Sequence, residues 1–228
     1  WSNAEPYAGD PPGWGHRLRD DGHRVDSVGK LHFRSTEDDN GYGEEIVPMH
    51  VLGGLGDLHG LMRSPPPTRP GVRLLAEETG KGESSYARYD DSIYEHSVQW
   101  LRERAAHPDD KPWVLFVSFV RPHFPLIAPA DLVDRYLAKQ LPLPFRRDWM
   151  PDHPVLAALR EVQNYNDFFR DDDHVRLALA AYYGMVTAID AQVGGLMKTL
   201  DETGLAANTR IVYTSDHGDN VGARGLWG

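Results

Sequence analysis

The chain has 228 residues, and its 40% hydrophobic and 25% charged residues are typical of a globular protein that can bury a sizeable core. A formal charge of −10 argues against a nucleic-acid partner, because such a field repels phosphates, and no apolar run approaches the ~18 residues of a membrane span. The chain has no cysteine, which excludes disulfides, thiolate metal sites and a cysteine nucleophile within these residues, and we expect a cytoplasmic location.

Two segments in the first half of the chain have a helical pattern followed by a strand pattern. Residues 14–21 are predicted to form a helix that ends at Gly22, and residues 24–29 to form the strand after it. Further along, Asp90-Asp91-Ser92 predicts the N-cap of a second helix. The apolar run 113–119 then predicts a central parallel strand that is covered on both faces.

A third such segment begins at Val175. From there to Leu200, apolar residues recur at alternating spacings of four and three, which places them on one face of a long helix. A coiled coil would show the same spacing, but it would not normally lead into a strand within about ten residues. Gly204 is predicted to end the helix, and Thr209–Thr214 is predicted to be a strand.

Three helix-then-strand segments predict an α/β fold with a largely parallel sheet and helices on both of its faces. We expect a single domain over residues 1–228. Residues 124–173 are rich in proline, aspartate and aromatic residues and are interpreted as an excursion outside the sheet. In such sheets ligands bind beyond the carboxyl ends of the strands, so the residues that follow each predicted strand are the candidate site.

Lys30 and His32 follow the first predicted strand. In an extended backbone, residues two apart project to the same side, so a cation and an imidazole would together face an oxyanion. A surface lysine beside a packed histidine would give the same pattern.

His123 follows the second predicted strand and lies between Pro122 and Pro125. The prolines restrict the backbone and hold the imidazole in a preset loop, which suits a proton donor or a substrate contact. The alternative is a stiff turn that merely caps the core.

Asp216 and His217 follow the third predicted strand. One carboxylate and one imidazole suit a divalent cation such as Ca²⁺, Mn²⁺, Mg²⁺ or Zn²⁺, although two ligands cannot hold a metal alone. The alternative is that Asp216 caps a following helix and His217 packs against it. Asp219 and Asn220 could orient His217. Histidines without a partner at ligand spacing, among them His16, His50 and His174, are interpreted as packed or surface residues.

Three motifs together resemble the sulfatase family of the alkaline phosphatase superfamily. They are Gly29-Lys30-Leu31-His32, Pro122-His123-Phe124-Pro125, and Thr214-Ser215-Asp216-His217-Gly218-Asp219-Asn220 with Gly225-Leu226-Trp227. The Asp-His form of the last motif resembles choline-sulfatase-like and phosphonate-monoester-hydrolase-like branches.

The resemblance implies an alkaline-phosphatase-like fold and a role for each candidate residue. Lys30 and His32 would contact the sulfate and the nucleophile, and His123 would contact the ester or protonate the leaving oxygen. Asp216 and His217 would bind a divalent metal, with Ca²⁺ favoured. The family's formylglycine nucleophile is expected upstream of Trp1, so we expect residues 1–228 to be inactive alone and the chain to be a piece cut at both ends.

The expected function of the parent protein is metal-dependent hydrolysis of a small-molecule sulfate ester. A phosphonate monoester hydrolase or phosphodiesterase on the same scaffold is one alternative, and a non-catalytic sulfatase-like module is another. The expected partner is a sulfate or phosphonate ester, with no nucleic acid and no membrane, and a homo-oligomer is left open.

Overall fold

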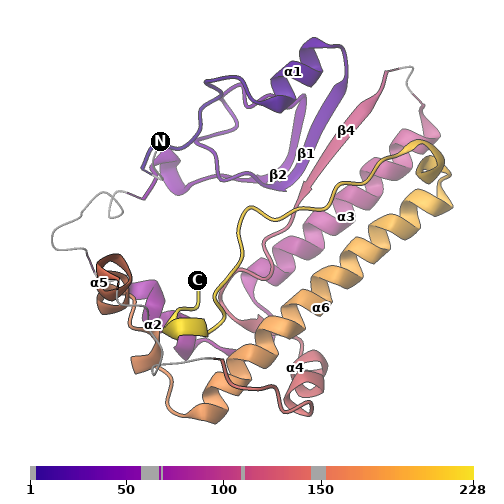
Figure 1. Ribbon diagram of the computed structural model, residues 1–228. Coiled ribbons are helices and arrows are strands. Elements are labelled where there is room, and N and C mark those ends of the chain that lie inside the picture. The colour runs from indigo at the N-terminus through magenta and orange to yellow at the C-terminus, as the bar shows by residue number, and fades with distance from the viewer. Residues whose placement is uncertain (1–3, 58–66, 68, 109–110, 145–152) are drawn as a thin grey trace. The chain divides into compact units, whose positions relative to one another are not determined.

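The computed structural model describes residues 4–57, 67, 69–108, 111–144 and 153–228. The α-helices are α1 Trp14–Asp20, α2 Pro70–Glu77, α3 Ser85–Ala106, α4 Ala130–Leu137, α5 Pro154–Val162 and α6 Asp172–Glu202 (Figure 1). The strands are β1 Arg24–Lys30, β2 Glu44–Met49, β3 Gly80–Lys81, β4 Trp113–Ser118 and β5 Ile127–Ala128. None of the helices in the described part of the chain is both long and apolar enough to cross a membrane.

The chain divides into two compact units, which we describe separately. The first unit comprises residues 1–63, 88–120 and 192–210, and the second comprises residues 64–87, 121–191 and 211–228. The predictions of one domain over residues 1–228 and of an excursion over residues 124–173 stay predictions. Within the excursion, residues 145–152 lie outside the described residues.

A parallel three-stranded sheet forms the centre of the first unit, in the order β2-β1-β4 (Figure 1). Ser27 of β1 pairs with Glu45 on one side and with Phe116 on the other, and both pairings are parallel. Because the strands are parallel, their carboxyl ends share one edge of the sheet. The predicted helix 14–21 and strand 24–29 are confirmed as α1 and β1.

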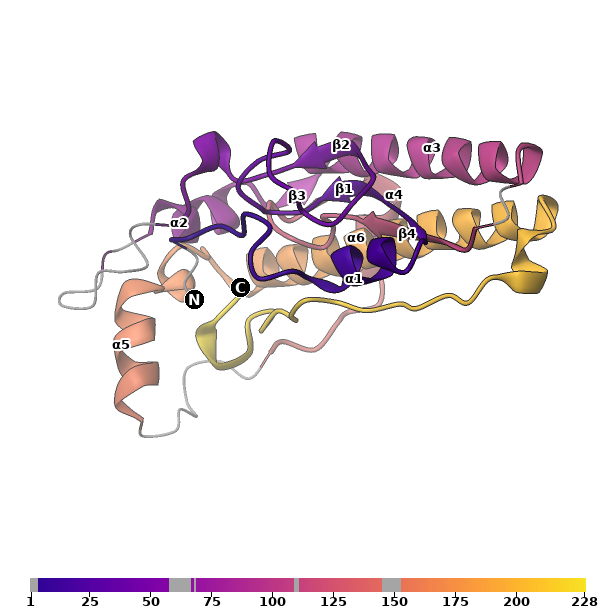
Figure 2. The same cartoon turned by 90° about the horizontal axis from the view of Figure 1, so that it is seen from above.

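Helices cover both faces of this sheet. On one face, the Trp14 ring of α1 packs edge-on against Phe116, with 5.9 Å between ring centroids. On the other face, Leu115 packs with Trp100 of α3 and Leu196 of α6, where the two helices run alongside one another (Figure 2). The neighbours Leu115 and Phe116 thus point to opposite faces, as the period of a strand requires. The prediction of helices on both faces is confirmed.

The apolar strand β4 does not have the central position predicted for it. In the described sheet β1 is central and β4 is at an edge, with every residue of β4 half-buried. β1 carries the buried positions instead, from Val25 to Gly29. The apolar residues of a strand indicate that other elements cover its two faces. Its position in the sheet depends instead on which strands pair with its edges.

The helix predicted to begin at Asp90-Asp91-Ser92 begins five residues earlier. α3 starts at Ser85, and the backbone N–H of Ala87 donates to Ser84 Oγ at 3.0 Å, so serine provides the N-cap. Asp90 lies inside the helix, is fully buried and accepts a hydrogen bond from the Val120 N–H at 2.7 Å. Its carboxylate therefore binds a distant backbone group, a contact that a local pattern does not reveal.

The strand predicted at Thr209–Thr214 is not formed, whereas the long helix before it is confirmed as α6. Gly204 has a φ of 76° just after the helix, as expected of a stop, and a short 3₁₀ helix, Leu205–Asn208, follows. Val212 and Tyr213 are 80% and 76% exposed. The segment has suitable β-branched residues, but no described strand offers it a backbone partner, and β propensity takes effect only within a ladder.

The second unit is built on the N-terminal part of α6. Its core joins α2, α4 and β5 to that helix through Leu75, Val133, Ala128 and Met185, each at most 2% exposed. β3 and β5 form a short parallel pair. These elements and β2 have no sequence prediction, because they are short or lie in segments without clear periodicity.

His174 joins α2 to α6 within this core. Its Nδ1 accepts the Arg170 N–H at 3.3 Å, so Nε2 carries the proton and donates to the Ala76 carbonyl at 3.0 Å. Burial, followed by the charge of Arg170, lowers the pKa of His174. The interpretation of His174 as a packed residue is confirmed.

Candidate active site

Lys30 and His32 lie where β1 ends, in the first unit. Lys30 is the half-buried last residue of the strand, and Leu31 after it is 8% exposed. The backbone N–H groups of Leu31 and His32 both donate to the Met49 carbonyl, at 3.0 and 2.9 Å. His32 is exposed and has a φ of 59°, so the extended backbone assumed in the prediction stops before it. A strand exit positions both side chains, but the two-residue period does not apply to this pair.

A β-bulge on β2 lies beside this exit. Val28 pairs with Ile46 but Lys30 pairs with Met49, so β2 has one extra residue opposite the end of β1. Val47 has a φ of 43°, a strained value for a β-branched residue, and its carbonyl accepts the Tyr89 hydroxyl at 2.6 Å. The bulge places the Met49 carbonyl where the N–H groups of Leu31 and His32 both donate to it. Sequence reasoning missed it, and Pro48 within the segment is the only local signal.

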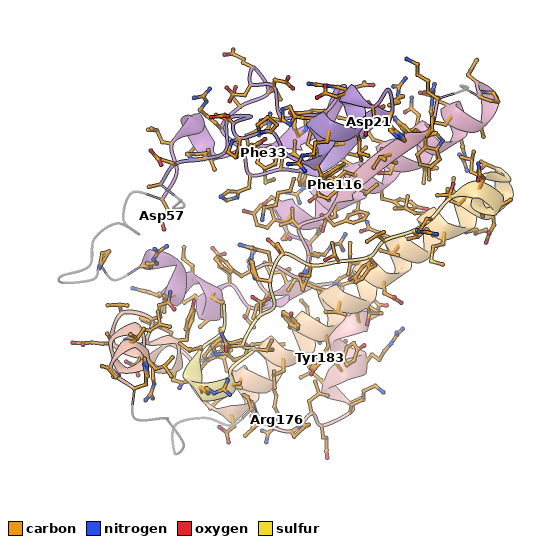
Figure 3. All side chains as sticks on the ribbon, turned by 45° about the horizontal axis from the view of Figure 1, so that its top comes forward. Asp21, Phe33, Asp57, Phe116, Arg176 and Tyr183 are labelled. Carbon is orange, nitrogen blue, oxygen red and sulfur yellow. The ribbon has the colours of Figure 1, made fainter. Side chains whose placement is uncertain are left out.

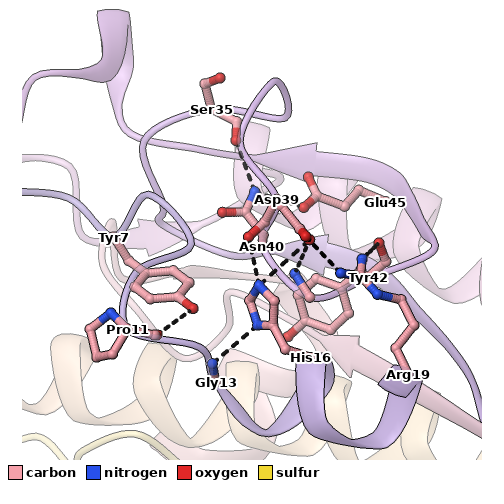
Figure 4. Close-up of polar contacts among 11 residues, drawn as sticks. Tyr7, Pro11, Gly13, His16, Arg19, Ser35, Asp39, Asn40, Tyr42 and Glu45 are labelled. Carbon is pink, nitrogen blue, oxygen red and sulfur yellow. Dashed lines mark hydrogen bonds and ion pairs between the residues drawn. The ribbon is translucent and has the colours of Figure 1, made fainter. Parts of the chain in front are cut away.

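Buried and half-buried polar side chains form hydrogen bonds with one another beside β2. His50 Nε2 lies 3.0 Å from Glu45 Oε2, and Asn40 Nδ2 donates to Glu45 Oε1 at 2.8 Å. Asn40 Nδ2 also donates to the Ser35 carbonyl at 2.8 Å (Figure 4). Among the described residues, no hydrogen-bond partner is found for Asn40 Oδ1 or His50 Nδ1. His50 has a packed role, as interpreted from the sequence.

Next to this network, α1 is tied to the loop before β2. His16 Nδ1 accepts the Gly13 N–H at 3.1 Å, so Nε2 donates to the Asp39 carbonyl at 2.8 Å (Figure 4). The Arg19 guanidinium donates to Asp39 Oδ2 at 2.7 Å and holds the pKa of that carboxyl at about 2. The side chains of His16, Arg19 and Asp39 use their polar atoms in these contacts, which indicates a structural role.

His123 lies in the second unit, in the loop between β4 and β5. Its Nδ1 donates to the Phe124 carbonyl at 2.8 Å, which fixes the tautomer and leaves Nε2 as the atom that can exchange a proton. The imidazole centroid is 4.3 Å from the Phe124 ring centroid and 5.8 Å from that of Tyr86. His123 is half-buried and is absent from the core, so the reading of it as a core-capping turn is not favoured.

Asp216 and His217 also belong to the second unit and are exposed. His217 Nε2 is 3.6 Å from Asp216 Oδ2, and the His217 N–H donates to Asp216 Oδ1 at 3.0 Å. No helix begins at Asp216, so the N-cap alternative does not hold. An oxygen and a nitrogen donor suit a divalent cation in kind. Within the described residues, however, no group of three or more histidine or acidic side chains could hold a metal, so two ligands are all that these residues offer.

The chain is anchored directly after this pair. Residues 211–218 are all exposed, whereas Asp219 is half-buried and its carboxylate interacts with the Tyr182 hydroxyl of α6. Burial and then the nearby Asp219 carboxylate raise the pKa of Tyr182 to about 12. Further on, the Trp227 ring stacks on Phe169 with centroids 4.7 Å apart. The packed turn after Asp219 therefore fixes one end of the exposed segment.

The candidate residues fall into two groups. Lys30 and His32 share the exit of β1 in the first unit, and His123, Asp216 and His217 belong to the second unit. That the three exits meet at one rim stays a prediction. Sequence reasoning missed Tyr86 and Phe124 beside His123, although Phe124 is part of the Pro-His-Phe-Pro motif.

Comparison with known proteins places these residues in a family context. The Sulfatase family model matches residues 16–228. The chain is 29% identical over 243 residues to the choline-sulfatase of Rhizobium meliloti (strain 1021), covering 100% of this chain and 46% of that protein. It is 35% identical over 130 residues to the arylsulfatase of Clostridium perfringens (strain 13 / Type A), covering 57% of this chain and 26% of that protein. The chain thus spans about half or less of the length of these relatives.

Solved structures give the fold. The phosphonate monoester hydrolase of Agrobacterium radiobacter matches 99% of this chain and 51% of its own length, with a TM-score of 0.70 and 20% identity. That of Silicibacter pomeroyi covers 100% and 51%, with a TM-score of 0.63 and 21% identity. The fold is therefore of the alkaline-phosphatase-like α/β class, which confirms the predicted fold. Because the family match extends over nearly all its residues, the chain belongs to the sulfatase family.

Proposed function

We propose that the protein to which this chain belongs hydrolyses sulfate esters of small alcohols. The observation that carries the proposal is the sulfatase family match over residues 16–228, which includes all five candidate residues. The curated relatives named choline-sulfatase and arylsulfatase support a sulfate rather than a phosphate-type ester.

Each candidate residue has a role that its surroundings support. The Lys30 ammonium, at the carboxyl end of a parallel strand, would donate a charge-assisted hydrogen bond to a sulfate oxygen. His32, held through its backbone by the Met49 carbonyl, would donate to a neighbouring oxygen. When His123 is protonated, Nδ1 keeps its bond to the Phe124 carbonyl and Nε2 can give its proton to the leaving alcohol oxygen.

Asp216 and His217 would supply an oxygen and a nitrogen ligand to a divalent cation, with Ca²⁺ preferred and Mn²⁺, Mg²⁺ or Zn²⁺ as alternatives. Such a cation would neutralise charge on the ester and on the nucleophile. The other ligands and a formylglycine nucleophile would come from outside residues 1–228, and we expect these residues to be inactive alone. The proposed location is cytoplasmic. A homo-oligomer is left open.

The proposal is tested by steady-state kinetics of the full-length protein with three substrates: 4-nitrophenyl sulfate, propyl sulfate and 4-nitrophenyl phenylphosphonate. We expect kcat/KM to be higher for the aryl sulfate than for the phosphonate. Turnover of the phosphonate alone would instead support the phosphonate monoester hydrolase alternative. Turnover of none of the three by a correctly folded protein would support a non-catalytic module.

The variant His123→Ala tests the role of the imidazole in the same assay. Propanol leaves poorly without a proton, whereas 4-nitrophenolate leaves readily. We therefore expect a loss of about a hundredfold or more in kcat/KM for propyl sulfate and a much smaller loss for the aryl sulfate. Equal losses on the two sulfates would remove His123 from the acid role.

A further inference from the structure

We propose that Tyr86 and Phe124 form an aromatic subsite beside His123 that recognises the alcohol part of the ester and selects alcohols that carry an aromatic ring. This inference rests on the proposed function, because it assumes that His123 faces the leaving oxygen. It adds two specificity residues and a class of leaving alcohol to that function.

Both rings lie next to the imidazole. The Phe124 ring is tilted 31° to the imidazole at 4.3 Å, and the Tyr86 ring stands at 80° to it at 5.8 Å. The bond from Nδ1 to the Phe124 carbonyl directs Nε2 away from that carbonyl. An oxygen bound at Nε2 would lie about 3 Å from that atom, so the rest of the alcohol is within reach of both rings.

The rings of Tyr86 and Phe124 are held in place by the backbone around them but are not buried in a core. Tyr86 is in the first turn of α3, which Ser84 caps, and Phe124 is fixed between His123 and Pro125. Neither ring belongs to the core of the second unit. Phe124 is 37% exposed, and a Cβ built at Gly71 of α2 would lie 4.0 Å from the Cε2 atom of the ring. The accessible part of the Phe124 ring, next to the His123 imidazole, is therefore available to contact a bound alcohol.

The chemistry of the site favours a neutral aromatic alcohol over a cationic one. An acid role requires a positive charge on His123, and that charge would repel a quaternary ammonium group held next to it. An aromatic ring carries no such penalty, and it can pack offset or edge-on against Tyr86 and Phe124. The alcohol is therefore expected to present an aromatic ring within two or three bonds of its oxygen.

The test compares 2-phenylethyl sulfate with propyl sulfate, whose leaving alcohols have similar acidity but differ in the ring. In the full-length protein, Phe124→Leu keeps the apolar bulk and removes the π face, and Tyr86→Leu does the same for the second ring. We expect each variant to lower the ratio of kcat/KM for 2-phenylethyl over propyl sulfate by roughly 3- to 10-fold. As a control, Tyr183→Leu should leave the ratio unchanged, because Tyr183 lies on α6 and stacks on Tyr136 (Figure 3).

Three outcomes would overturn the inference. Equal losses of kcat/KM on both esters would mean that the rings only position His123, and unchanged kcat/KM values for both esters would mean that the rings do not contact the alcohol. A loss confined to choline sulfate, assayed in parallel, would assign the rings to a cation. Failure of the proposed function is distinct, because the wild-type protein would then turn over neither sulfate.

Discussion

Gly29, the residue before Lys30, should be intolerant of any side chain. Its φ is 107°, and a Cβ built there would be 2.8 Å from Ile93 Cδ1 and closer still to the Ser118 carbonyl oxygen. Ser118 is the register partner of Gly29 on β4, so the clash is with backbone and no rotamer change can relieve it. We therefore predict that Gly29→Ala separates β1 from β4 at the end of the sheet that carries Lys30.

The expected loss in the free energy of unfolding has two contributions. Alanine at a positive φ costs about 1–2 kcal/mol, and forcing extra volume into a packed region costs about 1–3 kcal/mol more. Gly22→Ala is the matched control, because Gly22 has a φ of 88° but no atom within 4 Å of the added Cβ. The control should lose only the first contribution, the cost of alanine at a positive φ. Gly29→Ala should lose about 2–5 kcal/mol of the free energy of unfolding.

Urea unfolding of the full-length protein, followed by tryptophan fluorescence, measures both variants. With a slope of about 2 kcal/mol per molar urea, the midpoint of Gly29→Ala should lie about 0.5–1.5 M below that of Gly22→Ala. Equal midpoints would show that β4 moves away from the added Cβ at no cost in free energy. The pairing of Gly29 with Ser118 would then not be rigid.

Two further predictions concern the second unit. The folded state lowers the pKa of His174, so the unfolded chain binds more protons, and the free energy of unfolding should fall from pH 7 to pH 5. His174→Gln should flatten this slope, and an unchanged slope would assign it to other groups. Tyr182→Phe removes the hydroxyl that interacts with Asp219, so amide hydrogen exchange over residues 216–220 should accelerate several-fold, whereas Tyr183→Phe should leave it unchanged. Equal exchange rates in the two variants would exclude an anchoring role for Tyr182.

Elements with a local pattern can be predicted from the sequence. α1, β1 and α6 were predicted because apolar periodicity and glycine stops depend only on nearby residues. The α/β class followed from the same patterns. The motifs at Lys30, His123 and Asp216 were likewise readable, since they consist of a few adjacent side chains with recognisable chemistry.

How these elements pair and which contacts support them depends on the tertiary structure. The edge position of β4, the lack of a strand over residues 209–214 and the bulge at Val47 depend on which strands lie next to one another. The burial of Asp90 and the rings beside His123 likewise arise from residues distant in the chain. A local pattern carries no information on such partners, because hydrogen bonds and ring contacts form between groups that only folding brings together.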